Sequence, residues 1–132
     1  MQDAPAPFAP GKTLAEALLT PTRIYARALK PVFDAKLAKG AAHITGGGLV
    51  ENTPRALPDH LAAAFDWNAW TRPAVFEWLQ ETGGVPEEDM RRTFNLGVGM
   101  VLIVAADNAE RVIGMLNANG ETAFAAGVLK AA

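Results

Sequence analysis

Three consecutive glycines, residues 46–48, interrupt the chain at a point that any fold of this sequence has to accommodate. Glycine loses more conformational freedom on folding than any other residue, so a run of three disfavours a continuous helix or strand. The run also permits positive φ angles and leaves successive backbone N–H groups uncovered, so that they can converge on an anion. Residues 40–44 before it fit a short buried strand, and residues 49–55 after it fit one or two helical turns. The sequence therefore predicts a strand–loop–helix unit whose loop is either a plain turn or an anion-binding nest.

The remaining elements follow from apolar periodicity and from the glycines and prolines that end each segment. Helices are predicted over residues 13–19, 24–37, 73–81, 86–93 and 108–117. Further strands are predicted over residues 60–66, 100–105 and 122–129. This order of elements indicates an α+β fold, an α/β sandwich with about four strands in one mixed sheet and helices on one face.

Several local signals refine these elements. Thr13 and Glu16 have the spacing of a capping box at a helix N-terminus. Pro31 lies inside a helical pattern, so it predicts either a kink or a helix start near that residue, and Gly40 is a plausible C-cap. The continuous apolar run at residues 100–105 predicts a strand that is buried on both faces.

A length of 132 residues suits one domain with one core. Residues 1–12 are rich in proline and alanine and indicate an extended strap or linker, which leaves residues 13–132 as the domain. A chain that begins with such a segment is either a detached domain of a longer protein or a natural single domain with an N-terminal arm.

Charge and composition exclude several classes of function. The net charge is −2, with 12 basic and 14 acidic residues, so we expect no nucleic-acid partner. No apolar run reaches membrane-spanning length, and we expect no membrane partner. Cysteine is absent, which excludes disulfides and thiolate sites and fits a cytoplasmic protein. No set of His, Asp and Glu residues has metal-ligand spacing, so no metal site is predicted within the chain.

Ten residues in two glycine-rich segments are candidates for ligand contact. They are His43, Thr45, Gly46, Gly47, Gly48, Asn52, Arg55, Asn95, Gly97 and Gly99. The glycines would offer backbone N–H groups to phosphate, and a guanidinium can bind phosphate or a carboxylate as a fork. His43 is the candidate catalytic group, which would donate to phosphate or move a proton.

Each candidate also has a structural alternative. His43 can be a packed residue at a strand end, Thr45 can cap a turn, and Arg55 can anchor the loop through a salt bridge. Asn95 can clamp a turn, and Gly97 and Gly99 can allow close packing of a neighbouring element. The residues alone do not decide between the two sets of roles.

Three blocks, in this order, carry a resemblance to a known family. They read LLTPTRIY at residues 18–25, HITGGG followed by NTPR at residues 43–55, and TFNLGVGM at residues 93–100. Together they resemble the C-terminal domain of aminoimidazole ribonucleotide synthetases, also called phosphoribosylformylglycinamidine cyclo-ligases. The resemblance covers essentially the whole chain, and the N-terminal domain of that family has no counterpart in it.

The resemblance implies a function in purine biosynthesis. The family uses ATP with Mg²⁺ to convert formylglycinamidine ribonucleotide to aminoimidazole ribonucleotide in an active site between its two domains. It implies that the metal ligands lie chiefly in the N-terminal domain, which also forms the homodimer, and that this chain alone is inactive. The alternatives are a stand-alone module that binds ribonucleotide or phosphate or acts as a scaffold, and a related two-domain synthetase or kinase.

Overall fold

The computed structural model describes residues 2–132 and contains two separate antiparallel strand pairs in that range. Strand β1 (Ala38–His43) pairs with β3 (Met100–Val104), and β2 (Leu61–Phe65) pairs with β4 (Gly127–Ala131). The mixture of helices and strands that we predicted is confirmed. The prediction of one mixed sheet of four strands is wrong, because no strand of one pair bonds to a strand of the other among the described residues.

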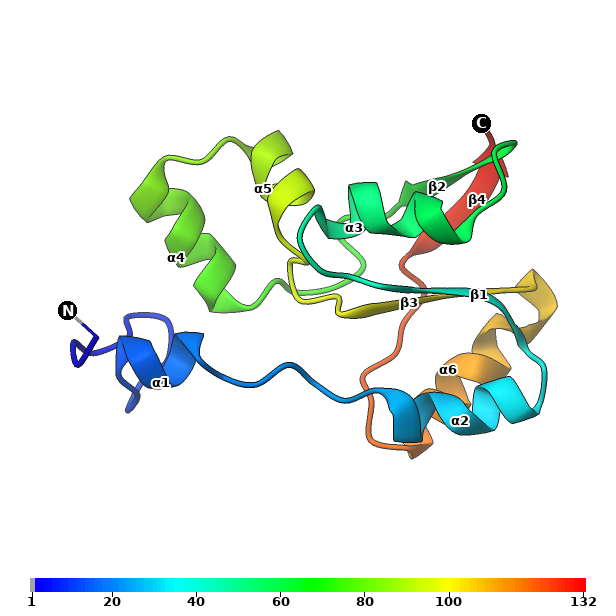
Figure 1. Ribbon diagram of the computed structural model, residues 1–132, viewed down its shortest axis with the longest axis horizontal. Helices are drawn as coiled ribbons and strands as arrows, with labels where there is room; N and C mark the ends of the chain where they lie inside the picture. The colour runs from blue at the N-terminus through cyan, green and yellow to red at the C-terminus, as the bar shows by residue number, and fades with distance from the viewer. Residues whose placement is uncertain (1) are drawn as a thin grey trace.

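The β1–β3 pair forms the centre of the molecule and has helices on both faces, not on one as predicted. Helices α2 (Ala26–Asp34) and α6 (Ala109–Ala118) cover one face, while α3 (Gly48–Asn52) and the 3₁₀ turn η1 (Thr53–Ala56) cover the other (Figure 1). The physical reason lies in β3, whose five residues are all apolar. Side chains of a strand alternate between its two faces, so an all-apolar strand needs cover on both.

Two hydrophobic clusters correspond to these two faces. Leu102 of β3 packs with the α2 and α6 side against Val32 and Val112, whereas Val101 packs with the α3 side against Leu49. Every residue of β3 is nevertheless only half-buried, so the predicted complete burial of this strand is not observed.

Three further helices lie outside this centre. Helix α1 (Leu14–Leu18) begins at the predicted capping box, since the Thr13 side chain accepts from the Glu16 N–H and the Glu16 carboxylate accepts from the Thr13 N–H. Helix α4 (Ala74–Gly83) ends at Gly84 in the left-handed conformation, and α5 (Glu87–Thr93) follows it. A second 3₁₀ turn, η2 (Ala106–Asn108), precedes α6.

The described part of the N-terminal strap, residues 2–12, folds back on α1. Pro5 forms a bridge with Thr13, and the Ala6 N–H bonds to the Lys12 carbonyl at 2.9 Å. Ala6 is buried, and the Phe8 ring lies 4.9 Å from the Trp78 ring of α4. These contacts attach the strap and α1 to the α4 side of the molecule.

Two predictions for residues 34–40 are wrong, one for a local reason and the other because of a distant residue. Helix α2 ends at Asp34 and not near Gly40, because Ala35 caps it and Lys36 takes a positive φ of 55°. Gly40 lies within β1, where an added Cβ would be 3.0 Å from the Ala56 carbonyl oxygen of η1.

The last strand, predicted over residues 122–129, is shifted to Gly127–Ala131. It pairs with the five residues of β2, so the length of β2 limits it, and the preceding residues 121–126 form no strand. The predicted strand at residues 60–66 and the helices at residues 73–81, 86–93 and 108–117 are confirmed with small shifts at their ends. Among residues 2–132, no helix has the length and apolar character needed to cross a lipid bilayer.

Candidate functional site

The triple-glycine loop lies beside the second glycine-rich turn because β1 and β3 are paired. β1 ends at His43, which is opposite Met100 in the register, and the next residue, Ile44, donates its N–H to the Gly99 carbonyl at 2.9 Å. Ile44 is almost completely buried and fixes the point where the loop leaves the sheet. The pairing thus brings together the two segments in which the sequence placed its candidate residues.

Hydrogen bonds to its carbonyl groups hold the loop. The Asn52 side-chain amide donates to the carbonyls of Gly48 at 2.8 Å, Gly46 at 3.1 Å and Thr45 at 3.4 Å. The Gly47 carbonyl accepts from the Glu51 N–H at 3.2 Å. Asn52 is 4% exposed and therefore acts inside the loop, where it organises the backbone and offers little surface to a ligand.

This arrangement decides where two N–H groups of the loop point. In a trans peptide the C=O and the following N–H point in opposite directions. The carbonyls of Thr45 and Gly46 face Asn52, so the N–H groups of Gly46 and Gly47 face away from it and take no part in the bonds of the loop. Two adjacent, outward-directed N–H groups have the arrangement of an anion nest.

Glycine stands at each of the three loop positions for a different structural reason. A Cβ added to Gly46 would meet no atom within 4 Å, so this residue borders open space. Gly47 has a φ of 98°, and a Cβ there would lie 2.7 Å from the Glu51 carboxylate. Gly48 is packed against the end of α5, since a Cβ would overlap the Arg91 carbonyl and lie 2.5 Å from the Phe94 carbonyl. Gly46 and Gly47 therefore face outward, whereas Gly48 serves packing.

The second glycine-rich turn is also shaped by close neighbours. The Asn95 side-chain oxygen accepts from the Gly97 N–H at 3.0 Å, which is the turn clamp considered for Asn95. Gly97 has a φ of 98°, and a Cβ there would be 2.6 Å from Pro73. A Cβ on Gly99 would overlap the Tyr25 hydroxyl. Each of these residues has the structural contact that was its alternative role, and none of these contacts excludes a ligand on the exposed side.

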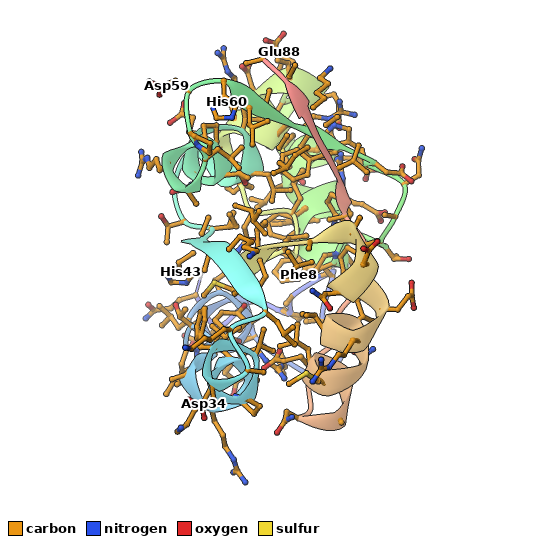
Figure 2. The ribbon with its side chains drawn as sticks, turned by 90° about the vertical axis from the view of Figure 1, so that its right-hand side faces the viewer. Phe8, Asp34, His43, Asp59, His60 and Glu88 are labelled. Carbon is orange, nitrogen blue, oxygen red and sulfur yellow. The ribbon has the colours of Figure 1, made fainter. Side chains whose placement is uncertain are left out.

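His43 and Arg55 are exposed on either side of the loop. The His43 ring makes an edge contact with Tyr25, with 6.1 Å between ring centroids. His43 extends from β1 at the surface, and the exposed His60 lies apart from it on the connection into β2 (Figure 2). The Arg55 guanidinium lies 3.5 Å from the Asn52 side-chain oxygen, and Thr45 donates its hydroxyl to that same oxygen at 3.5 Å. Arg55 thus contacts the residue that holds the loop, whereas the His43 ring packs on Tyr25 at the end of the strand that leads into the loop.

A network of charged groups supports the loop from behind. The Glu87 carboxylate accepts hydrogen bonds from Arg72 and from Arg91, the latter at 2.7 Å, and Gln80 donates to it at 3.2 Å. The bonds from Arg72, with those from Arg91 and Gln80, lower the pKa of Glu87 to about 2. Arg91 also lies over the Trp67 ring, 4.5 Å from its centroid. Because the Arg91 carbonyl packs against Gly48, this network fixes the backbone on which the loop rests at Gly48.

Sequence reasoning gave no individual role to Tyr25 or Glu51, although both lie in the blocks that carry the resemblance. Burial raises the pKa of the half-buried Tyr25 hydroxyl, which lies against the Gly99 backbone. Glu51 is exposed and places its carboxylate on Gly47. A helical spacing of four residues between Gly47 and Glu51 was the available signal for the second contact. No sequence signal pointed to the first.

The described residues contain no group of three or more His, Cys, Asp or Glu side chains arranged to hold a metal ion. Glu51 places its carboxylate beside Gly47, and one carboxylate does not make an Mg²⁺ site. The loop therefore offers donors for an anion, with one carboxylate beside them.

Comparison with known proteins decides which family this site belongs to. The family model described as "AIR synthase related protein, C-terminal domain" matches residues 2–132. The chain belongs to this family. As a member of the AIR synthase related C-terminal domain family, it has relatives that match nearly its whole length.

The names of two of these relatives refer to purine biosynthesis or to the cyclo-ligase reaction. The bifunctional purine biosynthetic protein ADE5,7 of Saccharomyces cerevisiae is 51% identical over 128 residues, which cover 97% of this chain and 16% of the yeast protein. The phosphoribosylformylglycinamidine cyclo-ligase of Neisseria meningitidis is 46% identical over 128 residues, which cover 97% of this chain and 37% of that protein. This AIR synthase related domain thus spans 16% to 37% of the length of these two relatives.

Proposed function

We propose that this chain forms the C-terminal part of the active site of an ATP-dependent phosphoribosylformylglycinamidine cyclo-ligase. Such an enzyme converts formylglycinamidine ribonucleotide to aminoimidazole ribonucleotide in purine biosynthesis. The names of relatives that share about half of their aligned residues with the chain support this proposal. The observation on the chain that carries it is the loop at residues 43–48, where two backbone N–H groups face outward and every carbonyl group from Thr45 to Gly48 is bonded inward.

The proposed reaction needs positioning more than it needs a reactive side chain. ATP transfers its γ-phosphoryl group to the amide oxygen of the substrate, which turns a poor leaving group into a good one. The amidine nitrogen then attacks the activated carbon, the ring closes, and phosphate leaves. Catalysis of such steps rests on orientation and on donors aimed at the developing negative charge. Preorganised backbone N–H groups fit this need.

We assign the chain's residues to these tasks as follows. Gly46 and Gly47 bind a phosphate oxygen through their N–H groups, and Gly48, Asn52, Asn95, Gly97 and Gly99 hold the backbone that presents them. Thr45, Arg55 and His43 lie at the rim of the loop and contact the bound phosphate or substrate from there. His43 either donates a hydrogen bond to phosphate or moves a proton, and its exposed position beside Tyr25 suits both roles.

The Glu51 carboxylate sets a condition on phosphate binding. It lies against Gly47, close to the N–H groups that a phosphate would use. Two anions repel each other at this distance, so the exposed Glu51 side chain turns away when phosphate binds or faces a cation that neutralises both. When bound, Mg²⁺ would neutralise phosphate charge, and we propose that its remaining ligands come from the N-terminal domain of a two-domain protein. We further propose that such a protein is a cytoplasmic homodimer.

A chimera tests the proposed function. The matched region of the Neisseria relative is replaced by this chain, and the product is assayed with ATP and formylglycinamidine ribonucleotide for ADP and for the cyclised ribonucleotide. We expect both products in equal amounts. ADP without ring closure, or a folded chimera without either product, contradicts the proposal.

Two variants of the chimera test the loop. Gly46→Val places a branched side chain in the open space before the proposed anion site, so we expect kcat/KM to fall at least about 100-fold, because a single misplaced donor in such a site has that effect. Gly114→Val on α6 also adds a side chain in open space, but far from the loop, and serves as the matched control. Equal activity of the two variants contradicts the assignment of the loop.

A further inference from the structure

A groove of about 710 Å³ opens between β3, α6 and the segment of residues 121–129. Its walls are aliphatic and aromatic over most of their length, and they include residues of both strand pairs. The walls include Leu102, Val112, Ile113, Leu116, Phe124 and Val128. Arg23 and Glu121, which form an ion pair of 2.8 Å, lie at one end. A small polar ligand would find few partners along these walls, whereas an apolar chain segment fits them.

The backbone of β3 offers an unpaired edge to this groove. Within residues 2–132, β3 pairs with β1 alone. The Ile44 N–H bonds to the Gly99 carbonyl, so this opposed pair is a hydrogen-bonded one. Because bonded and non-bonded pairs alternate along an antiparallel ladder, Met100 and Leu102 direct their N–H and C=O groups away from β1. Unpaired backbone groups beside apolar walls are unfavourable unless water or another strand bonds to them, and an exposed strand edge is a template for strand addition.

Thr53 supplies a second, independent unpaired group. Its side chain is 1% exposed and lines the groove, and its hydroxyl has no hydrogen-bond partner within the described part of the chain. Buried hydroxyls in folded proteins are nearly always hydrogen-bonded. The groove thus combines an apolar surface, a free strand edge and a buried unpaired hydroxyl, and a polypeptide backbone with apolar side chains can satisfy all three.

From these features we infer that the groove is a docking site for an extended apolar segment of polypeptide, which adds to the free edge of β3 as a strand. The segment comes from the part of the full-length relatives that this chain does not match, which is 63% of the Neisseria cyclo-ligase, the remainder after the 37% that is covered. Main-chain bonds to Met100 and Leu102 provide affinity, and side chains that alternate along the added strand fill the groove.

A second copy of the chain is a poorer occupant. Its own β3 lines the same groove together with residues of α6 and of the segment 121–129, so a β3–β3 contact has to bring both sets of flanking residues together. The strand that docks has to be free of such flanks at the moment of pairing. A segment of the unmatched polypeptide meets this condition.

Hydrogen exchange measures the occupancy of the β3 edge directly. The isolated chain and the chimera with the Neisseria relative are compared at the Met100 and Leu102 amides, and a co-expressed pair of the chain and the unmatched polypeptide provides the same comparison without the fusion. We expect both amides to exchange at least about 100-fold more slowly in the chimera and in the pair, as for amides that enter a stable ladder. The readout does not depend on catalysis, so an inactive protein still gives an answer.

Matched variants on α6 separate groove occupancy from general destabilisation. Ile113→Lys introduces a charge into the groove, whereas Gly114→Lys introduces the same charge one residue later in open space. We expect Ile113→Lys to remove the added protection of Met100 and Leu102 in the chimera, and Gly114→Lys to preserve it.

Three outcomes overturn the inference. The first is protection of the Met100 and Leu102 amides in the dilute isolated chain, which would mean that its own residues fill the groove. The second is protection that appears only as the isolated chain is concentrated, which would identify a second copy as the occupant. The third is rapid exchange of both amides in the chimera and in the co-expressed pair, which would show that no strand is added.

Discussion

The side-chain amide nitrogen of Asn52 lies 2.8 Å from the carbonyl oxygen of Gly48 and also reaches the carbonyls at the start of the same loop. One buried side-chain amide thus donates to carbonyl groups that three successive glycines do not pair in a regular helix or strand. The loop is therefore ordered by a residue from the helix that follows it. This relationship determines which peptide groups are left for a ligand.

We predict that Asn52→Ala lowers the free energy of unfolding by about 2–3 kcal/mol, because several carbonyl groups lose their donor in a buried place. Asn52→Asp should have a similar or larger effect, since a carboxylate accepts but does not donate and would face the same carbonyls. Urea unfolding of the isolated chain provides the measurement. Asn119→Ala removes a bond of the same length, 2.8 Å to the Met115 carbonyl, at an exposed site, and should change stability by less than about 0.5 kcal/mol.

The contact between Gly99 and Tyr25 leads to a second prediction. A Cβ on Gly99 would overlap the Tyr25 hydroxyl, so Gly99→Ala forces the half-buried ring to move and should cost about 1–3 kcal/mol. Combination with Tyr25→Ala removes the overlap, and the double variant should then be no less stable than Tyr25→Ala alone. Gly46→Ala, at a position with open space, is the control. Additive effects of Gly99→Ala and Tyr25→Ala in urea unfolding would contradict the contact.

Local signals in the sequence predicted local structure well. The capping box of Thr13 and Glu16 forms as expected, because both partners lie within one turn of helix. The strand–loop–helix unit around residues 46–48 is also confirmed, since glycine limits what the chain can do at that point. These features depend on residues that are close in sequence, and their energies do not require knowledge of the rest of the fold.

Strand pairing and the reasons for individual glycines were not predictable in the same way. The apolar run of β3 indicated a buried strand, but which strands pair depends on partners far along the chain, and here the four strands form two pairs. Likewise, close packing was one of the roles considered for Gly99, without a named neighbour, whereas Gly48 was expected to contact phosphate. The atoms concerned belong to Arg91 and Tyr25, which reach the glycines only through tertiary packing.

The candidate residues chosen from the sequence have two kinds of structural surroundings. The pairing of His43 with Met100 brings both glycine-rich segments together. Asn52 and Asn95, however, direct their side chains into the backbone of their own turns. A sequence shows that an amide side chain is present but not which way it points, so ligand binding and loop support cannot be separated at that stage.

The charged network behind the loop predicts a specific dependence on pH. Glu87 has a pKa of about 2 in the folded chain and an ordinary value of 4.5, so its contribution to stability is complete above pH 4.5 and is lost as the pH falls from there towards 2. The Glu87 side chain is 41% exposed, so solvent screening limits the expected contribution to about 1 kcal/mol. Stability measured by urea unfolding between pH 5.5 and pH 2.5 should therefore fall less steeply for Glu87→Gln. Glu88→Gln changes a neighbouring carboxylate that is 82% exposed and should leave the slope almost unchanged.

The Glu51 carboxylate provides a test of phosphate binding that does not depend on turnover. Because it lies against Gly47 beside the two outward N–H groups, its negative charge opposes an anion there. We predict that Glu51→Gln binds inorganic phosphate several-fold more tightly than the unchanged chain, as about 1 kcal/mol of charge repulsion is removed. Isothermal titration with phosphate at low ionic strength measures the change. Glu88→Gln removes the same charge away from the loop, and an equal gain in that variant would mean that net charge, not the position of Glu51, is responsible.

The buried hydroxyl of Thr53 gives the last prediction. In the isolated chain this group is 1% exposed and has no partner within residues 2–132, so Thr53→Val, which replaces a hydroxyl by a methyl group of similar shape, should raise the free energy of unfolding by about 1 kcal/mol. Thr93→Val at the exposed end of α5 should change it by less than about 0.5 kcal/mol. In the chimera, where an added strand can meet the hydroxyl, the same Thr53→Val change should no longer stabilise. Urea unfolding of both proteins measures this reversal, and an equal gain in the two would indicate that the hydroxyl stays unpaired in the longer protein as well.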